Sequence, residues 1–532
     1  MGRIEISVLG AASLVLMLGA TACGSDAELA EGGVGTGDPN FGTGGSFNAG
    51  TGGSSSGEPG SGMDGGLPPE QEIESAYRAP VVTGRYVWSA NPESGRIAVI
   101  DPETLVVRLA DAGLGPTELA ALPERDGVDR AIVINSGSGE ASLLRADDES
   151  VESTAKLPLH EGANVWAISK SGRWAIAWTE ASRIEDPDPA LGFQDLTLID
   201  LDREEAFELS VGFRPSRVLF SDDEERAFVV TEPGLSVIEL DEAPRVSALV
   251  ELTEDPIAEP GSRDVSVRPD GALAFVRVEG SAELGVVDLE TAELTTRDLG
   301  APITDLDLSG DGETLSAVVG GALVTLPATK DGALSEEVSF SSETLRSVSV
   351  SADSSFSVLY TTAFENSHVG AVLVSDGDFA SAVTRVVDVK APVTSALVAP
   401  GAAHAIVLGK TPAGSSKAGV FAVVPAQMDR IVKVVGTDAP PVSMAFAADG
   451  EHALLSTRDD VNRRYGAYVV ELENLAETFV PLKSPPSSIG VLRSGKAFVA
   501  QLHPEGRITF VDLSSGDAHT LTGFELSAKV TQ

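Results

Sequence analysis

Short apolar runs alternate with clusters of turn residues along the chain from about residue 80 onward. The runs hold five to seven residues and are rich in valine, isoleucine and leucine, and no long segment has a helical period. In "DVSVRPDGALAFVRV", two such runs flank a Pro-Asp-Gly turn. Alternate residues of a strand share a face, so Val265 and Val267 are expected to pack between neighbouring sheets. The pattern predicts an all-β protein.

The runs and turns recur as a unit of about 45 residues that contains four expected strands. The turn after the first strand of each unit marks the period, with gaps of 41 to 52 residues, at Gly127, Gly172, Glu224, Gly271, Gly312, Ser354, Gly401, Gly450 and Gly495. Four strands in such a span are typical of one β-propeller blade. About ten units can be counted, and 7–10 blades fit the pattern.

The two ends of the repeat array predict how the ring closes. The first unit shows no opening strand, whereas an additional strand pattern, "GFELSAKVTQ", follows the last unit at Gly523–Gln532. We expect this C-terminal strand to complete the first blade, because a closed ring leaves no free sheet edge. The turns themselves need a positive φ angle, which glycine or a small polar residue supplies.

An aspartate follows the third strand in several units, at Asp101, Asp200, Asp288 and Asp512. A carboxylate in this position accepts hydrogen bonds from backbone N–H groups two residues further along the chain. Because these aspartates recur at the same place in the unit, we expect them to hold turns rather than ligands.

One unit carries a family resemblance. "RYVWSANPESGRIAVIDPETLVV", from Arg85 to Val107, is similar to the YVTN-type β-propeller repeat, whose core reads YV-N---S-VSVID--T--V. The matching positions are Tyr86, Val87, Asn91, Ser94, Val99, Ile100, Asp101 and Thr104. The resemblance implies a propeller of four-stranded blades over residues 79–532.

The N-terminal segment resembles a bacterial lipoprotein signal. Residues 6–22 are apolar or small and lead to Cys23, the only cysteine of the chain. The matching lipobox residues are Ala20, Thr21, Ala22 and Cys23. The resemblance implies that residues 1–22 are removed and that Cys23 becomes a lipidated N-terminus. Gly24, rather than aspartate, follows the cysteine, which by resemblance to the enteric sorting rule implies the outer membrane. Residues 23–78 are rich in glycine, serine and proline, a composition that predicts a disordered tether.

The charge balance restricts the partners of this chain. It has 80 acidic and 37 basic residues, a formal net charge of −43. Nucleic acid and anionic lipid would repel such a molecule as a whole. We therefore expect no nucleic-acid partner, and a membrane contact only through the lipid on Cys23. The oligomeric state stays open.

Two inserted segments offer candidate binding residues. "IEDPDPALGFQD" holds Asp186, Asp188 and Asp195, whose carboxylates could bind calcium, although their spacing is not that of an EF-hand. The same unit contains Trp174 and Trp178, which share one face of a strand and either pack between blades or bind a partner. "DDVNRRYGAY" places Arg463, Arg464 and Tyr465 together, a composition enriched at interfaces.

The chain offers no set of catalytic residues with a recognised spacing. None of the six histidines forms a zinc-like pair with another histidine or with a second cysteine. No cofactor other than calcium is expected. These observations favour a lipid-anchored envelope propeller that binds a protein or a glycan through loops on one rim. The alternatives are an enzyme that acts on a sugar or lactone in the central channel, and a structural spacer.

Overall fold

The computed structural model describes residues 79–524, except 189, 253–262, 279, 332–346, 352–354, 361–370, 377–382, 390, 412–413 and 428. In this part of the chain, 39 strands form ten antiparallel sheets, which we number blade 1 to blade 10 in chain order. Nine sheets have four strands, and blade 6 has three within the described residues. The prediction of an all-β propeller with about ten units is confirmed.

The strands of each blade follow one another in space as they do in sequence. Blades 1 to 3 consist of β1 (Val81–Val82), β2 (Val87–Asn91), β3 (Arg96–Ile100) and β4 (Val107–Asp111); β5 (Pro116–Arg125), β6 (Val128–Asn135), β7 (Glu140–Ala146) and β8 (Val151–Pro158); and β9 (Val165–Ile168), β10 (Trp174–Trp178), β11 (Asp195–Asp200) and β12 (Glu205–Ser210). Blades 4 to 6 consist of β13 (Arg217–Phe220), β14 (Arg226–Val230), β15 (Gly234–Glu239) and β16 (Arg245–Glu251); β17 (Arg263–Val267), β18 (Leu273–Val278), β19 (Glu283–Asp288) and β20 (Glu293–Asp298); and β21 (Ile303–Leu308), β22 (Thr314–Val319) and β23 (Ala322–Pro327).

Blades 7 to 10 continue the same order. They consist of β24 (Ser347–Val350), β25 (Phe356–Tyr360), β26 (Ala371–Asp376) and β27 (Val383–Asp388); β28 (Val393–Val398), β29 (His404–Gly409), β30 (Gly419–Pro425) and β31 (Lys433–Thr437); β32 (Pro441–Phe446), β33 (His452–Asp459), β34 (Arg464–Glu471) and β35 (Ala476–Pro481); and β36 (Pro486–Val491), β37 (Lys496–Gln501), β38 (Arg507–Asp512) and β39 (Ala518–Thr522). Helix in the described part of the chain is limited to the 3-10 turn η1 (Ala181–Arg183). No helix there is long and apolar enough to span a bilayer.

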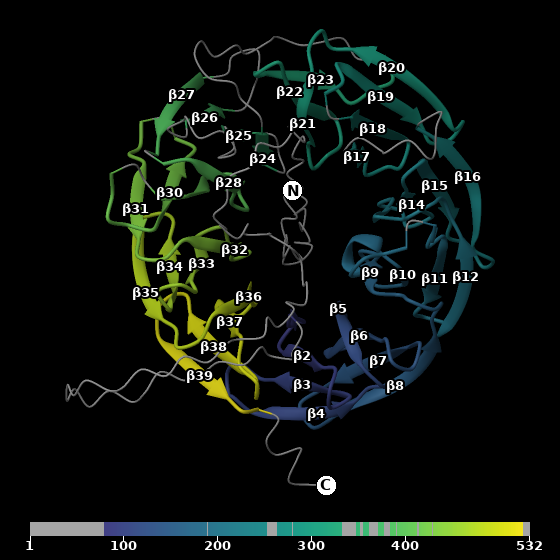
Figure 1. Ribbon diagram of the computed structural model, residues 1–532, viewed down its shortest axis with the longest axis horizontal. Coiled ribbons are helices and arrows are strands. Elements are labelled where there is room, and N and C mark those ends of the chain that lie inside the picture. The colour runs from purple at the N-terminus through teal and green to yellow at the C-terminus, as the bar shows by residue number, and fades with distance from the viewer. Residues whose placement is uncertain are drawn as a thin grey trace, which may run out of the picture.

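The blades stand around a ring, with the first strand of each blade on the inside and the last on the circumference (Figure 1). Apolar residues of each blade pack against the next blade, and every neighbouring pair shares at least one buried cluster. Val265, which is 2% exposed, belongs to the cluster between blades 4 and 5, as expected, and Val267 packs against it.

The ring closes by packing between blades 10 and 1. Val87 and Ile100 of blade 1 share a cluster with Phe498 and Phe510 of blade 10. Lys496 adds an ion pair to Glu103 at 2.8 Å. The expectation that the first blade lacks its own opening strand is wrong, because β1 pairs with β2 and takes the innermost position. The C-terminal strand expected at 523–532 lies, beyond Phe524, outside the described residues.

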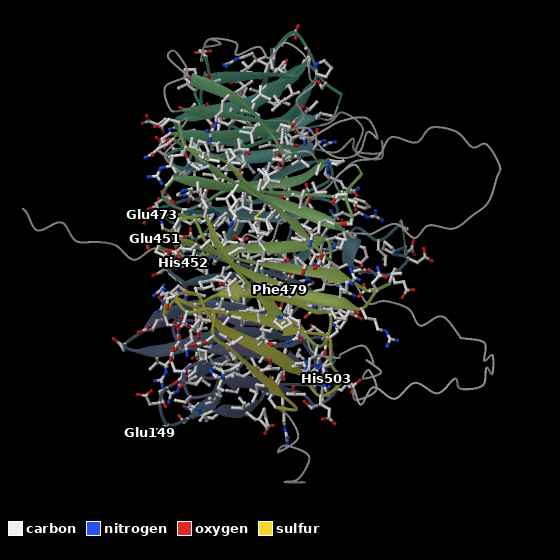
Figure 2. All side chains as sticks on the ribbon, turned by 90° about the vertical axis from the view of Figure 1, so that its left-hand side faces the viewer. Glu149, Glu451, His452, Glu473, Phe479 and His503 are labelled. Carbon is white, nitrogen blue, oxygen red and sulfur yellow. The ribbon has the colours of Figure 1, made fainter. Side chains whose placement is uncertain are left out.

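The two faces of the ring differ in their connections, because consecutive strands of a blade run in opposite directions. One face carries the turns between first and second strands and between third and fourth strands, and we call it the turn face. The other carries the loops between second and third strands and between blades, and we call it the loop face. Figure 2 shows Glu149, Glu451 and Glu473 on the turn face and His503 on the loop face.

The turn residues behave as the repeat predicts. All eight described members of the series from Gly127 to Gly495 have positive φ angles, including Glu224 with φ 55°. Ser354 lies outside the described residues. The recurring aspartates accept backbone N–H groups two and three residues on: Asp101 from Glu103 and Thr104, Asp200 from Asp202 and Arg203, Asp288 from Glu290 and Thr291, and Asp512 from Ser514 and Ser515. Their structural role is confirmed.

Candidate functional site

An open depression of about 800 Å³ lies on the turn face between blades 3 and 4. The β9–β10 turn, the β13–β14 turn and the β15–β16 turn surround it. Its lining is strongly charged: Lys170, Ser171, Arg173, Asp222, Asp223, Glu224, Glu225, Glu239, Leu240, Asp241 and Glu242. Seven of these side chains are carboxylates and two are cations. We call this feature the acidic depression.

Glu224 joins two of the three turns that surround the depression, the β13–β14 turn and the β9–β10 turn. Its carboxylate accepts hydrogen bonds from the Ser169 hydroxyl, at 2.9 Å, and from the backbone N–H and hydroxyl of Ser171. These bonds cross from blade 4 to blade 3, so the floor of the depression is held by contacts between two blades. Within the same turn, Asp223 accepts the Ser221 hydroxyl and the Glu225 N–H, and these bonds lower the pKa of its carboxyl.

The two cations of the depression are already partnered. Arg173 lies 3.5 Å from Asp200 and 4.6 Å from the centre of the Trp174 ring. Lys170 lies 3.7 Å from Asp222. Two of the lining carboxylates are paired with cations outside the lining, Asp241 with Arg245 at 2.6 Å and Glu242 with Arg203 at 3.5 Å. The other five carboxylates still outnumber the two lining cations, so the depression carries an excess of negative charge toward solvent. A positively charged partner therefore fits it best.

Comparisons with known proteins add a likeness of fold. No family model matches the chain, and no curated protein matches it. Three of the similar solved structures are AztD from Citrobacter koseri, the Myceliophteria thermophila Cps50 (Swd1) β-propeller domain and the dihydro-heme d1 dehydrogenase NirN. AztD is 12% identical, with 62% of this chain and 92% of that chain covered and a TM-score of 0.38. The Cps50 domain is 14% identical, with 64% and 96% covered and a TM-score of 0.35. NirN is 16% identical, with 68% and 75% covered and a TM-score of 0.42.

At these identities and TM-scores the likenesses carry no inference about function. The resemblance of Arg85–Val107 to the YVTN-type repeat stays a prediction from the sequence.

The two tryptophans considered for partner binding lie in the core. Trp174 is 0% exposed and Trp178 is 5% exposed, and both belong to the cluster between blades 3 and 4. They share one face of β10, as their spacing predicts, and this face points at the neighbouring blade. Their location is that of packing between blades, the alternative considered from the sequence.

The acidic residues considered for calcium do not converge. In the part of the chain that the structure describes, one group of three or more potential metal ligands has ligand atoms within 4.8 Å of one another, and it consists of Asp449, Glu451 and His452. Asp186, Asp188 and Asp195 are exposed and do not form such a group. Asp188 accepts the Ala190 N–H and Asp195 accepts the Ser210 hydroxyl, which are local structural bonds.

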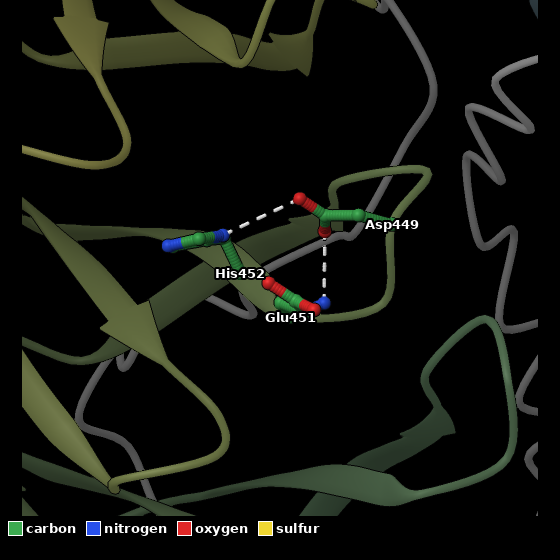
Figure 3. Close-up of side chains that lie close together, drawn as sticks. All are labelled: Asp449, Glu451 and His452. Atoms are coloured by element: carbon green, nitrogen blue, oxygen red, sulfur yellow. Dashed lines mark hydrogen bonds and ion pairs between the residues drawn. The ribbon is translucent and has the colours of Figure 1, made fainter.

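The group at Asp449 belongs to the β32–β33 turn (Figure 3). Asp449 accepts the Glu451 N–H at 2.8 Å and lies 3.5 Å from Nδ1 of His452. Both carboxylates are exposed and Asp449 holds its own turn. These contacts assign the group a structural role in the turn.

The third predicted set lies on the loop face. Arg463 and Arg464 are exposed at the end of the β33–β34 hairpin, and Tyr465 is half-buried below them. Burial raises the pKa of the Tyr465 hydroxyl. The other insertion, at 184–195, connects β10 with β11, so both predicted insertions lie on the loop face, opposite the acidic depression.

A second cluster of titratable groups lies on the inner strands. Asp305 and Asp307 on β21 accept the backbone N–H groups of Val348, at 2.8 Å, and Val350, at 3.1 Å, on β24. Burial raises the pKa of Asp307 to about 6 and that of Asp305 above its ordinary value. The Val348 and Val350 N–H groups lie on the edge of β24 that β25 leaves free, so the two carboxylates connect neighbouring inner strands.

The acidic depression and the contacts of Asp305 and Asp307 were not predicted from the sequence, for two different reasons. The acidic runs "SDDEE" and "ELDEA" are visible in the sequence, but nothing local indicates that the turns of different blades lie side by side. The pattern "ITDLDL" did carry a signal, since two aspartates alternate with apolar residues in a first strand.

Proposed function

We propose that this protein is a lipid-anchored envelope propeller that binds a positively charged segment of a protein partner on its turn face. The acidic depression is the observation that supports this function. It combines a volume of about 800 Å³ with seven carboxylates on three turns of two adjacent blades. Its turns are fixed by hydrogen bonds before a partner arrives, so little conformational entropy is lost when a partner binds.

Charge complementarity of this kind accelerates association and depends on salt. A negative surface of several carboxylates attracts cationic groups over about 10 Å at moderate ionic strength. Exposed ion pairs contribute about 0.2–1 kcal/mol each, so a partner needs several lysines or arginines to bind well. The formal net charge of −43 adds a long-range attraction in the same direction.

Reversal of three charges in the acidic depression is expected to weaken binding of a fluorescent oligolysine peptide at least about tenfold at low salt. The variant combines Asp222→Lys, Glu225→Lys and Glu242→Lys, and fluorescence anisotropy gives the Kd. The matched control makes the same change in net charge at exposed positions of other blades. It combines Glu149→Lys, Glu290→Lys and Asp517→Lys. Equal losses for both variants would show that net charge alone attracts the peptide, and the proposed site would be wrong.

The proposed location is the bacterial outer membrane, with residues 1–22 as the signal peptide, Cys23 as the lipid attachment site and residues 23–78 as the tether. Residues 1–78 lie outside the described part of the chain. The lipobox resemblance supports the anchor, Gly24 after the cysteine supports the outer membrane, and the composition of residues 23–78 supports the tether.

Replacement of Cys23 by serine is expected to move the protein from the membrane fraction to the soluble fraction, because serine has no thiol to receive the lipid. Fractionation of cells that express the full chain measures this, with Ser25→Ala as the matched control. Unchanged membrane association of Cys23→Ser would contradict the lipid anchor.

A further inference from the structure

We propose that the β33–β34 hairpin on the loop face docks onto an anionic lipid surface and holds the turn face away from the membrane. This inference rests on the proposed lipid anchor and adds a second contact with the membrane. It departs from the expectation that the membrane is met only through the lipid on Cys23.

The shape of the hairpin supports this proposal. In β33 and β34, eight residue pairs run from His452↔Glu471 to Asp459↔Arg464. The corresponding hairpins of blades 8 and 10 each have six pairs. Two additional pairs extend the paired strands by about 7 Å, so the strands of this hairpin are longer on the loop-face side than those of both neighbours.

The tip of the hairpin has the composition of a membrane-surface contact. Val461 is 92% exposed, and Arg463 and Arg464 follow it on the exposed tip. An apolar side chain beside cations suits the boundary between acyl chains and anionic headgroups. Tyr465, half-buried at the base, is of the aromatic type that is common at this depth.

The surroundings of the tip add positive charge in an otherwise acidic molecule. Lys417, Arg458 and Lys483 lie on the loop face of blades 8 and 9. Lys417 pairs with Asp438 at 2.7 Å, and Arg458 pairs with Asp460 at 2.9 Å. Together with the two arginines of the tip, five cations stand against Asp438, Asp459 and Asp460. The local charge is therefore positive, although the whole chain carries −43.

The path of the chain places this patch toward the membrane. Pro80 leads into β1, and the β1–β2 turn lies on the turn face, so the chain enters the ring from the loop face. Pro80 also lines a small cavity with Gly506, in the β37–β38 loop, and with Arg507, the first residue of β38. The same loop holds His503, which lies on the loop face (Figure 2). A tether from Cys23 would thus pull the loop face toward the bilayer.

Because the tether holds the domain near the membrane, a few cations at the hairpin tip are sufficient for docking. Residues 23–78 are predicted from composition to be flexible, and a flexible linker of this kind keeps a domain at an effective concentration of about millimolar near its anchor. Each lysine or arginine near an anionic surface contributes about fivefold to binding. Arg463 and Arg464 together would shift the equilibrium between docked and undocked molecules about 25-fold.

The chain allows a direct test, because Cys23 is its only cysteine and is blocked when lipidated. Purified full-length protein with Val461→Cys is reconstituted into phosphatidylcholine vesicles with or without about one third phosphatidylglycerol. The rate of labelling by a bulky maleimide reports the exposure of the tip, and flotation of the vesicles reports the lipid anchor separately. Glu149→Cys, on the turn face (Figure 2), is the matched control, and the unsubstituted chain gives the background.

We expect labelling of Val461→Cys to be at least about tenfold slower on vesicles with phosphatidylglycerol at low salt, and to recover at high salt. Labelling of Glu149→Cys stays constant. Addition of Arg463→Glu and Arg464→Glu removes the protection while the vesicles still carry the protein on flotation. Equal rates on the two kinds of vesicle, or protection on pure phosphatidylcholine, would overturn the anionic-lipid contact. Protection of Glu149→Cys would overturn the orientation. If the protein does not float with the vesicles, the lipid anchor is contradicted. The labelling rate measures only the contact of the tip, so the two proposals fail separately.

Discussion

Replacement of Gly450 by alanine is expected to lower the free energy of unfolding by about 3 kcal/mol or more. Gly450 sits in the β32–β33 turn with φ 70°, and a Cβ atom there would lie 2.0 Å from the carbonyl oxygen of Pro400 in the preceding blade. A left-handed backbone costs an L-residue about 1–2 kcal/mol, and displacement of a backbone atom in a packed interface adds a similar amount. Thermal and urea denaturation of the full chain measure the loss.

Gly495→Ala is the matched control for this change. Gly495 holds the same place in blade 10 with φ 82°, but a Cβ atom added there would meet nothing within 4 Å. Its variant should therefore lose only about 1–2 kcal/mol, the cost of the backbone conformation alone. Equal losses at the two sites would show that contact between the turns of neighbouring blades does not contribute to stability.

Replacement of Asp307 by asparagine is expected to stabilise the protein at pH 7.5 by about 2 kcal/mol. The pKa of Asp307 is raised from 3.8 to about 6 by burial, with the charges of Asp305 and Asp264 acting in the same direction. The folded protein therefore binds a proton more readily than the unfolded chain. The stability from this proton is fully present below about pH 4 and is lost as the pH rises through about 6. The amide keeps an oxygen to accept the Val350 N–H without the buried charge.

The pH dependence of unfolding shows whether the gain in stability from Asp307→Asn comes from removal of the charge. The gap between Asp307→Asn and the unsubstituted protein should shrink as the pH falls from 7.5 to 4, as followed by urea denaturation. Asp311→Asn, in the exposed β21–β22 turn, should show the opposite sign, because a hydrogen bond from Ser309 and the Glu313 N–H lower the pKa of Asp311. A gap for Asp307→Asn that does not change with pH would refute the buried-charge explanation.

The variants of Gly450 and Asp307 test the stability of the ring, whereas those of the acidic depression and the β33–β34 hairpin test binding. The carboxylates of β21 and the glycines of the turns hold neighbouring blades together, whereas the acidic depression and the β33–β34 hairpin expose charge on opposite faces. If both proposals hold, the loop face meets the membrane and the turn face is presented to a cationic partner. The rigid ring would then set the distance between the two contacts.

Local features of the fold could be predicted well from the sequence. A positive φ at Gly271 and the N–H bonds of Asp288 involve only a few consecutive residues, so their pattern repeats wherever the turn recurs. The alternation that places Val265 in the core is likewise a property of a single strand. The predicted strands, blade period and turn aspartates therefore agree with the structure.

Contacts between blades were decided only by the tertiary structure. Gly450 meets Pro400, Asp307 meets Val350 and Glu224 meets Ser171, and each pair is separated by more than 40 residues. Nothing in either partner's local sequence indicates the other, because the curvature of the ring determines which turns and strands lie side by side. For the same reason the sequence alone left both roles open for Trp174 and Trp178. Their shared face followed from strand geometry, but its burial depended on the position of blade 4.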